Sequence, residues 1–341
     1  VRADAKSAFA WGPENKQVAF AREGLRVTTL DGKQRLLDRE SPTAIAWSPD
    51  GTQLVAAFPG GKDAANSRLR IVDSQGSRLA ETAIKGRVGR LFWPEEQRIL
   101  AGSAELKMYS FGSNFKTTLY HWNGRDTPVA TVLRDSTLSR PIVEALGARL
   151  IDSFFVSLSA LGTEIVYAQA VHPPAFPVRL DIILRHLETG IERHLASVSM
   201  TGSGAIFSTD SEQILCANNT TQSSWINLWT DKKSPGVDAV GWSLAQSPGG
   251  RYLWLDGRLF QDDQEVGMVP SPGAARFSSD GSMLLAQRGG SLVLLSGFRD
   301  AVPPSLPPGQ RSELTTMRRL LFQGLISQEE YLSRKPAVAT P

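Results

Sequence analysis

Six residues of this sequence are the first candidates for catalysis or metal binding: the four histidines, the single cysteine and one of the serines. They are His121, His172, His186, His194, Cys216 and Ser203. A metal site needs several His, Asp, Glu or Cys ligands that converge on one point, and the spacing of the histidines does not bring three of them together. The chain also lacks the Gly-x-Ser-x-Gly turn of the α/β-hydrolases. We therefore expect no catalytic residue, no metal and no cofactor.

Cys216 and Ser203 have simpler explanations than catalysis. Cys216 follows Ile214 and Leu215 in an apolar stretch that is typical of a strand, which indicates a small buried residue. Ser203 lies in the run Thr-Gly-Ser-Gly, which is typical of a turn before a strand. A single cysteine also excludes an intramolecular disulfide.

Composition and charge exclude several classes of protein. The 341 residues are 41% hydrophobic and 21% charged, as in a soluble globular protein. The net charge of +3 comes without a basic run, so we expect no nucleic-acid partner. No apolar run is long enough to span a membrane. Because the sequence begins at Val1 rather than Met, we expect that a leader or anchor was removed. We expect contact with a membrane only through such an anchor.

A repeated pattern must position any functional residue. Residues 44–57 read AIAWSPDGTQLVAA, which is typical of a strand that ends at Trp47, a turn, and a second apolar strand. In the turn, Pro49 fixes φ, Asp50 bonds the local backbone, and Gly51 accepts a positive φ. Such a turn is a common hairpin connection.

The pattern occurs seven times, at a mean spacing of about 44 residues, and four-stranded propeller blades repeat at roughly 40–45 residues. The copies open at Trp11, Trp47, Trp93, Leu158, Phe207, Gln246 and Phe277. We predict an all-β fold, a seven-bladed β-propeller over residues 1–298. Six or eight blades stay open because the copies are unevenly spaced, and a β-sandwich is the alternative fold. The last copy offers three strands, at about 273–277, 283–287 and 291–296, so we expect residues 1–6 to supply its fourth strand and close the ring.

The turns at 47–51, 207–211, 246–250 and 277–281 resemble the WD40-like repeats (PD40 type) of TolB-like propellers. The resemblance implies a bacterial protein in the periplasm or at the outer membrane, and a lipoprotein if the removed leader carried a lipid anchor. It implies a fold but not one function, because such repeats occur in translocation factors, in the propellers of prolyl-peptidase enzymes, in some lyases and in many other bacterial proteins.

The C-terminal residues predict a proline-rich spacer at 299–311, two short helices at 312–335 and a disordered tail at 336–341. The helical segment SELTTMRRLLFQGLISQEEYLSRK resembles the bacterial hairpin called SHOCT. Ser312 is the expected cap of the first helix, Gly324 its stop, and Ser327 with Glu330 a capping box for the second helix. A hairpin this small must dock on its own propeller, on a second copy or on a partner. The residues we expect to mediate oligomerisation are Leu314, Met317, Leu321, Leu325 and Tyr331; Leu314 and Met317 form one apolar face with Leu320 and Leu321.

The connections between the second and third strands are long in copies two to five, and long loops are uncommon unless they are functional or disordered. They should build a raised rim. The expected partner-binding residues on it are Lys62, Asn66, Lys107, Phe111, Phe115, His172, Phe176, Asn218 and Asn219. We therefore predict a non-catalytic interaction scaffold that binds a protein or peptide on this rim. Loops that only cap blade edges, and a lyase-like enzyme or small-ligand binder with a metal near His172, are the alternatives.

Overall fold

The computed structural model describes most of the chain. The described residues are 8–60, 66–109, 112–138, 155–170, 179–199, 204–208, 212–217, 223–230, 232–237, 244–269, 272–288, 291–300 and 306–335. The chain divides into two compact units, Val1–Phe155 and Val156–Pro341. Each unit is built from antiparallel sheets whose hydrogen-bonded strands follow one another in sequence order.

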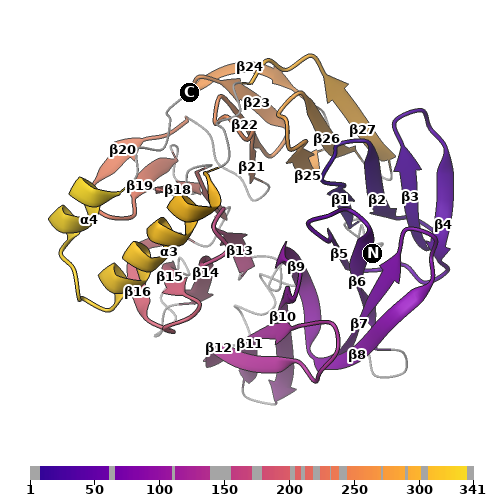
Figure 1. The fold of residues 1–341 in the computed structure, drawn as a ribbon, viewed down its shortest axis with the longest axis horizontal. Coiled ribbons are helices and arrows are strands. Elements are labelled where there is room, and N and C mark those ends of the chain that lie inside the picture. Colours follow the sequence, from indigo (N-terminus) through magenta and orange to yellow (C-terminus); the bar gives the residue numbers. More distant parts are fainter. Residues whose placement is uncertain are drawn as a thin grey trace. The chain divides into compact units, whose positions relative to one another are not determined.

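The first unit holds three four-stranded sheets, which we call blades one, two and three (Figure 1). Blade one is β1 (Phe9–Trp11), β2 (Gln17–Ala21), β3 (Leu25–Thr29) and β4 (Gln34–Asp38). Blade two is β5 (Ala44–Trp47), β6 (Gln53–Pro59), β7 (Asn66–Asp73) and β8 (Arg78–Lys85). Blade three is β9 (Arg87–Glu95), β10 (Arg98–Tyr109), β11 (Gly112–Trp122) and β12 (Val129–Leu138).

The second unit holds blades four to seven and two helices. Blade four is β13 (Phe155–Leu158), β14 (Glu164–Ala170), β15 (Arg179–His186) and β16 (Glu192–Ser199), and blade five is β17 (Gly204–Phe207), β18 (Gln213–Ala217), β19 (Ser224–Asn227) and β20 (Lys233–Pro235). Blade six is β21 (Leu244–Gln246), β22 (Tyr252–Leu255), β23 (Arg258–Gln261) and β24 (Gln264–Met268), and blade seven is β25 (Pro272–Phe277), β26 (Met283–Arg288) and β27 (Ser291–Ser296). The helices are α3 (Pro308–Phe322) and α4 (Gln328–Arg334).

The blades coincide with the repeated pattern of the sequence. The residue that opens each copy lies in the first strand of a blade, from Trp11 in β1 to Phe277 in β25. The predicted seven-bladed β-propeller with a C-terminal helical pair is therefore confirmed. In blade seven the described residues form three strands, and the segment 1–6 predicted to complete it lies outside the described residues.

A serine hydroxyl, on a buried residue in four cases and on the half-buried Ser208 in the fifth, shapes the first turn of five blades. The serine directly follows the residue that opens the copy. Its hydroxyl accepts a hydrogen bond from the backbone N–H of the residue five positions later, at 2.9–3.0 Å. These serines are Ser48, Ser159, Ser208, Ser247 and Ser278. In blades two, four, six and seven the glycine three residues after the serine takes a positive φ, 71° at Gly51, as the turn chemistry predicts. In blade one Asn15 takes that place with a φ of 56°.

Blades one and two pack together through Trp47. Its indole N–H donates to the carbonyl of Ala10 in β1 at 3.2 Å, and its ring belongs to an apolar cluster that includes Leu25 and Leu54. The buried Arg70 on β7 adds ion pairs to Asp38 in β4 and to Glu81 in β8. The repeated tryptophan position therefore serves packing between blades at Trp47.

The helical pair begins earlier than its sequence predicts. α3 starts at Pro308 with Pro307 as its cap, so Ser312 lies inside the helix and the prediction that it caps α3 is wrong. The reason is that proline suits the first turn of a helix, where its missing N–H is not needed. The stop signal is confirmed, because Gly324 follows the end of α3 with a φ of 68°. Of the predicted capping box the serine half is confirmed: the Ser327 hydroxyl accepts the N–H of Glu330 at 3.1 Å. Among the described residues no helix is both long and apolar enough to cross a membrane.

Candidate functional site

Each blade has two edges, and both edges carry candidate sites. One edge holds the turn between the first and second strands and the turn between the third and fourth; we call it the turn edge. The other holds the connection between the second and third strands, where the predicted partner rim lies; we call it the loop edge. The distinction follows from the sequential order of antiparallel strands.

At the loop edge of blade three, strands stand where the sequence predicts a long loop. β10 and β11 pair continuously from Ile99 with Trp122 to Tyr109 with Gly112. Phe115, expected to be exposed, is fully buried (0%), so that expectation is wrong. The physical reason is the period of two in a strand, which turns Phe115 to the buried face together with Ser113 and Thr117.

The end of β10 is nevertheless exposed. β9 pairs with β10 only as far as Ala104, so the last five residues of β10 extend beyond its partner. On this extension Leu106 is 39% exposed, Tyr109 is 60% exposed, and Lys107 is exposed. Of the other predicted partner-binding residues, Asn66 is half-buried at the start of β7. The rest lie outside the described residues: Lys62, Phe111, His172, Phe176, Asn218 and Asn219.

At the turn edge of blades four and five, the helical pair is docked through a buried arginine (Figure 1). Arg318 of α3 is fully buried (0% exposed) and forms ion pairs with Glu164 at 3.3 Å and Glu212 at 2.9 Å. Tyr331 of α4 accepts from Arg318 at 3.2 Å and donates to Glu212 at 3.2 Å. Lys335 reaches Glu212 at 2.9 Å from the end of α4. Both helices thus share one pair of acidic residues.

The charges at this contact support one another. Burial by itself lowers the pKa of Arg318, but the nearby Glu164, Tyr331 and Glu212 outweigh it and raise that pKa. Burial raises the pKa of Tyr331, and Arg318 offsets only part of this increase. Arg318 therefore stays charged and Tyr331 neutral at physiological pH, which matches the hydrogen bonds that they make.

Aromatic rings complete the docked contact. The Arg318 guanidinium lies 5.1 Å from the centroid of the Trp229 ring in blade five. Tyr331 and Phe322 pack on the same Trp229, with ring centroids 4.9 and 6.1 Å away, and Phe322 also contacts His186 at 5.1 Å. His186 is thus part of the surface that holds the helices.

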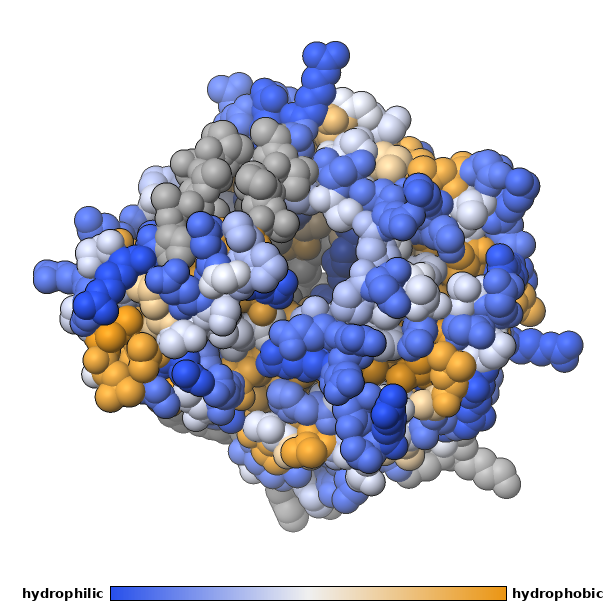
Figure 2. All heavy atoms as spheres, in the orientation of Figure 1, coloured by the Kyte–Doolittle hydropathy of each residue, from blue (hydrophilic) through white to orange (hydrophobic). Residues whose placement is uncertain are grey.

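The residues predicted to mediate oligomerisation divide into two groups. Leu314, Met317 and Tyr331 are buried within this chain, whereas Leu321 is half-buried and Leu325 is 67% exposed. In Figure 2 a hydrophobic group lies over the turn between α3 and α4, where Leu325 is found, on a face that is otherwise mostly hydrophilic. The helical pair therefore docks on its own unit. This is one of the three docking partners that the sequence left open, the others being a second copy of the chain and a different protein.

Sequence reasoning missed Arg318 and its two acidic partners, although signals for them exist. Arg318 lies four residues after Leu314 and so falls on the apolar face of α3. Glu164 stands where blades one, two and five carry Gln17, Gln53 and Gln213. A charge that replaces a neutral amide at a repeated position, and a charge on an apolar face, are each unusual.

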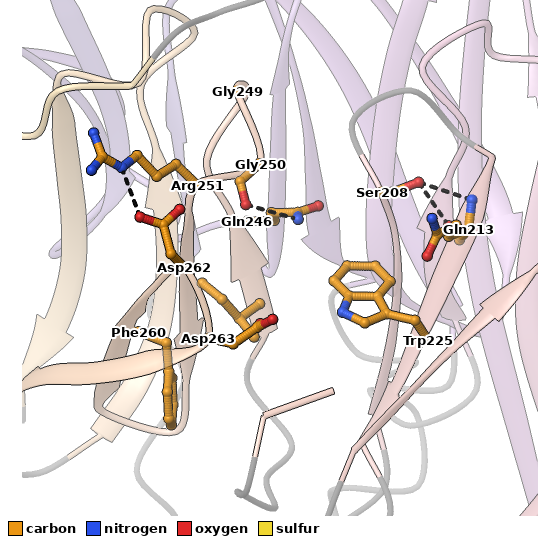
Figure 3. Close-up of a pocket in the computed structure, with 11 residues that line it drawn as sticks. Ser208, Gln213, Trp225, Gln246, Gly249, Gly250, Arg251, Phe260, Asp262 and Asp263 are labelled. Carbon is orange, nitrogen blue, oxygen red and sulfur yellow. Dashed lines mark hydrogen bonds and ion pairs between the residues drawn. The ribbon is translucent and has the colours of Figure 1, made fainter. Parts of the chain in front are cut away.

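A second feature of the turn edge is a pocket of about 380 Å³ between blades five and six. Figure 3 shows Trp225 on one wall and the ion pair between Arg251 and Asp262, 3.2 Å, on the other. Gln246 lies between the walls, and Asp263 lies across from Trp225. Polar groups line most of the pocket, together with Leu253 and the aromatic residues Trp225 and Phe260.

The residues considered for chemistry are placed apart. His121 lies in β11, His186 contacts Phe322, and His194 is exposed with its ring nitrogen 3.1 Å from Asp181. Within the described stretches no three potential metal ligands cluster. Cys216 is buried in β18, and burial raises the pKa of its thiol to about 12, which keeps it protonated and unreactive. Ser203 lies outside the described residues.

Comparisons with known proteins bear on the fold. No protein-family model matches the chain, and no curated protein is similar to it in sequence. A chain in a solved structure titled "Crystal Structure of Mitotic Checkpoint Complex" is similar in fold, with a TM-score of 0.61 and 15% sequence identity over 88% of this chain and 89% of that one. At this identity the likeness shows the fold alone. The chain therefore has the fold of a seven-bladed, WD40-like β-propeller.

Proposed function

We propose that the chain is a non-catalytic scaffold that binds a protein or peptide at the loop edge of its blades. The observation that carries the proposal is the end of β10, which extends five residues beyond β9. Propellers of this kind often serve as interaction scaffolds, and proteins usually shorten, charge or cover exposed strand edges.

The extension suits an extended peptide as its ligand. Among the described residues no strand pairs with β10 on the side that β9 leaves after Ala104. A free strand edge offers backbone donors and acceptors to an added strand, while neighbouring side chains give specificity. Leu106 and Tyr109 offer apolar and aromatic contact area there, and Lys107 offers charge.

A photo-crosslinking experiment tests this proposal. A photoreactive amino acid replaces Lys107 in one version of the protein and Lys33 in another, both expressed in the native cells. Lys33 is an exposed lysine at the turn edge of blade one, so it is a matched control. We expect a discrete adduct from position 107 and none from position 33. Adding Leu106→Ser and Tyr109→Ser should remove most of that adduct while the melting temperature stays within about 2 °C, because both side chains are exposed.

Two results would contradict the proposal. One is the same set of adducts from positions 107 and 33, which would mean nonspecific collision. The other is an adduct that persists unchanged after both serine substitutions, because the partner would then not use this surface.

The proposed setting is the bacterial periplasm or outer membrane, and its support is the resemblance of the turns to TolB-like repeats. Fractionation of the native cells tests it: we expect the protein in the periplasmic or membrane fraction. Recovery with cytoplasmic markers would reject this setting and leave the proposed binding surface standing.

A further inference from the structure

We propose that the pocket between blades five and six binds a guanidinium group, presented by an arginine residue of a peptide or by free arginine. The pocket opens on the turn edge of the second unit, and it is built by the described residues of β17–β19 and β21–β23 with their turns. It shares no residue with the loop edge of blade three.

The aromatic wall offers a flat face to a planar cation. Trp225 is half-buried, with part of its ring packed on the apolar cluster of blades five and six and part lining the pocket (Figure 3). A guanidinium stacks on an indole face by cation–π attraction, for which tryptophan is the best partner. The packing also holds the ring in place before a ligand arrives.

The opposite wall carries one uncompensated negative charge. Arg251 is already engaged: it pairs with Asp262 at 3.2 Å and donates to the carbonyl of Arg299 at 3.3 Å. Asp263 has no ion pair or hydrogen bond within the described part of the chain. Two carboxylates against one guanidinium leave a net charge of −1, so the pocket favours a cation over an anion.

Gln246 adds a hydrogen-bond acceptor inside the pocket. Its amide nitrogen donates to the carbonyl of Gly250 at 3.3 Å, which directs the amide oxygen elsewhere. That oxygen is buried, and no hydrogen bond reaches it from any described residue. A buried acceptor without a donor costs roughly 1–3 kcal/mol. A rotation of the Gln246 side chain that turns this oxygen toward the pocket would let an N–H group of the ligand satisfy it.

The same unit already binds one guanidinium with the same kinds of group. In the neighbouring contact, Arg318 lies over Trp229 and between the carboxylates of Glu164 and Glu212. The pocket offers Trp225 with Asp262 and Asp263 in an open version of that arrangement. Its volume of about 380 Å³ is at the small end for ligand pockets, which fits one side chain rather than a large cofactor.

Arginine fits this set better than lysine. Its five N–H donors lie in one plane, so it can stack on Trp225 and still donate sideways to Asp263 and Gln246. An ammonium group has no flat face for the indole. Discrimination between the two cations is therefore a specific consequence of the proposal.

Titration by nuclear magnetic resonance, observed at the indole N–H of Trp225, tests the site in the full chain. The probes are the capped tripeptide Gly-Arg-Gly, its citrulline and lysine versions, and free arginine. Citrulline has the shape of arginine without its charge. We expect the Trp225 signal to shift with the arginine peptide, at least tenfold weaker binding of the citrulline peptide, and severalfold weaker binding of the lysine peptide.

Two variants complete the experiment. Asp263→Asn should weaken binding of the arginine peptide by about tenfold, since one charge-assisted hydrogen bond is lost. Asn tolerates the left-handed backbone at position 263, where φ is 65°, so the variant should keep its fold. Asp31→Asn is the control, because Asp31 occupies the same turn of blade one and its loss should leave binding unchanged.

The outcomes show which molecule presents the guanidinium group and whether the proposal holds. Tighter binding of the capped peptide than of free arginine identifies a peptide ligand, and the reverse order identifies the free amino acid. Equal binding of the arginine and citrulline peptides would overturn the proposal, as would unchanged binding in Asp263→Asn. Because the crosslinking experiment uses the loop edge of the first unit, either proposal can fail without the other.

Discussion

At the scale of single residues, Arg318 is the most consequential side chain of the second unit. A buried ion pair adds little net stability over an apolar contact, but removal of one partner leaves the other charge buried and uncompensated. Arg318 faces two acidic residues, Glu164 and Glu212, and both are buried. Its loss is therefore far more damaging than the loss of an exposed arginine.

The variant Arg318→Met should weaken the docking of α3 and α4 by about 3–5 kcal/mol, because two carboxylates lose their counter-charge. Hydrogen exchange of the α3 amides measures the change. Arg319→Met is the control: Arg319 is partly exposed and pairs with the exposed Glu188, so we expect less than about 1 kcal/mol. Glu164→Gln, which restores the residue of blades one, two and five, should recover part of the loss in Arg318→Met. Equal effects of the Arg318 and Arg319 variants would contradict this prediction.

The functional residues were harder to predict than the fold for a physical reason. A turn depends on four or five consecutive residues, so Pro49, Asp50 and Gly51 are enough to predict it. Arg318 depends on Glu164, 154 positions earlier in the chain, and on Glu212, 106 positions earlier. Contacts between residues so far apart in the chain cannot be predicted from a local pattern in a single sequence.

At the scale of elements, the first turn of five of the blades depends on a serine as much as on the proline, aspartate and glycine. The chemistry of proline, aspartate and glycine predicts the turn without any role for the serine. Blade four lacks the proline and the aspartate, yet Ser159 keeps the same hydrogen bond to the N–H of Glu164, at 3.0 Å. The hydroxyl is thus the more constant part of the turn in this chain.

The variant Ser247→Ala should destabilise the second unit by about 1–3 kcal/mol. The Ser247 hydroxyl is fully buried and accepts the N–H of Tyr252 at 2.9 Å, so its removal leaves a buried donor unsatisfied. Urea unfolding, followed by the near-ultraviolet circular dichroism of the aromatic residues, measures the change. Ser296→Ala, an exposed serine at the end of β27, is the control and should change stability by less than about 0.5 kcal/mol. Indistinguishable unfolding midpoints of the two variants would reject this role of the hydroxyl.

At the same scale, the loop predicted after Ala104 is wrong, because this segment forms strands. Proline and glycine mark the connection that follows β6, whereas the segment after Ala104 carries no such residue until Gly112. Its length suggested a loop, but its alternating side chains pair as a hairpin of β10 and β11. Phe115 became a buried residue as a result.

At the scale of the whole molecule, the helical pair is part of the second unit and is not an independent module. Its apolar residues Leu314 and Met317 are buried, and its charges are compensated by blades four and five. A hairpin of this size has too few buried residues to be stable alone. Cooperative loss of the helices and their two blades follows from this dependence.

Deletion of residues 306–341 should increase hydrogen exchange in β14–β19 and leave β1–β8 unchanged. The physical reason is that the deletion uncovers Glu164, Glu212 and Trp229 in the second unit only. The mass in solution should fall only by the mass of the deleted segment, because Leu314, Met317 and Tyr331 are already covered by their own chain. A change from dimer to monomer on deletion would show that the helices join two copies instead.

The long sequence separation between Arg318 and its acidic partners also determines the order in which this contact can form during translation. The ribosome makes Glu212 about 100 residues before Arg318, which at roughly 5–20 residues per second is an interval on the order of ten seconds. Throughout that interval the nascent blades four and five must keep both carboxylates hydrated. Docking of the helices on these two blades therefore waits until Arg318 and Tyr331 have been synthesised. A translation product truncated before them would expose Glu164, Glu212 and Trp229, which are buried in the intact chain.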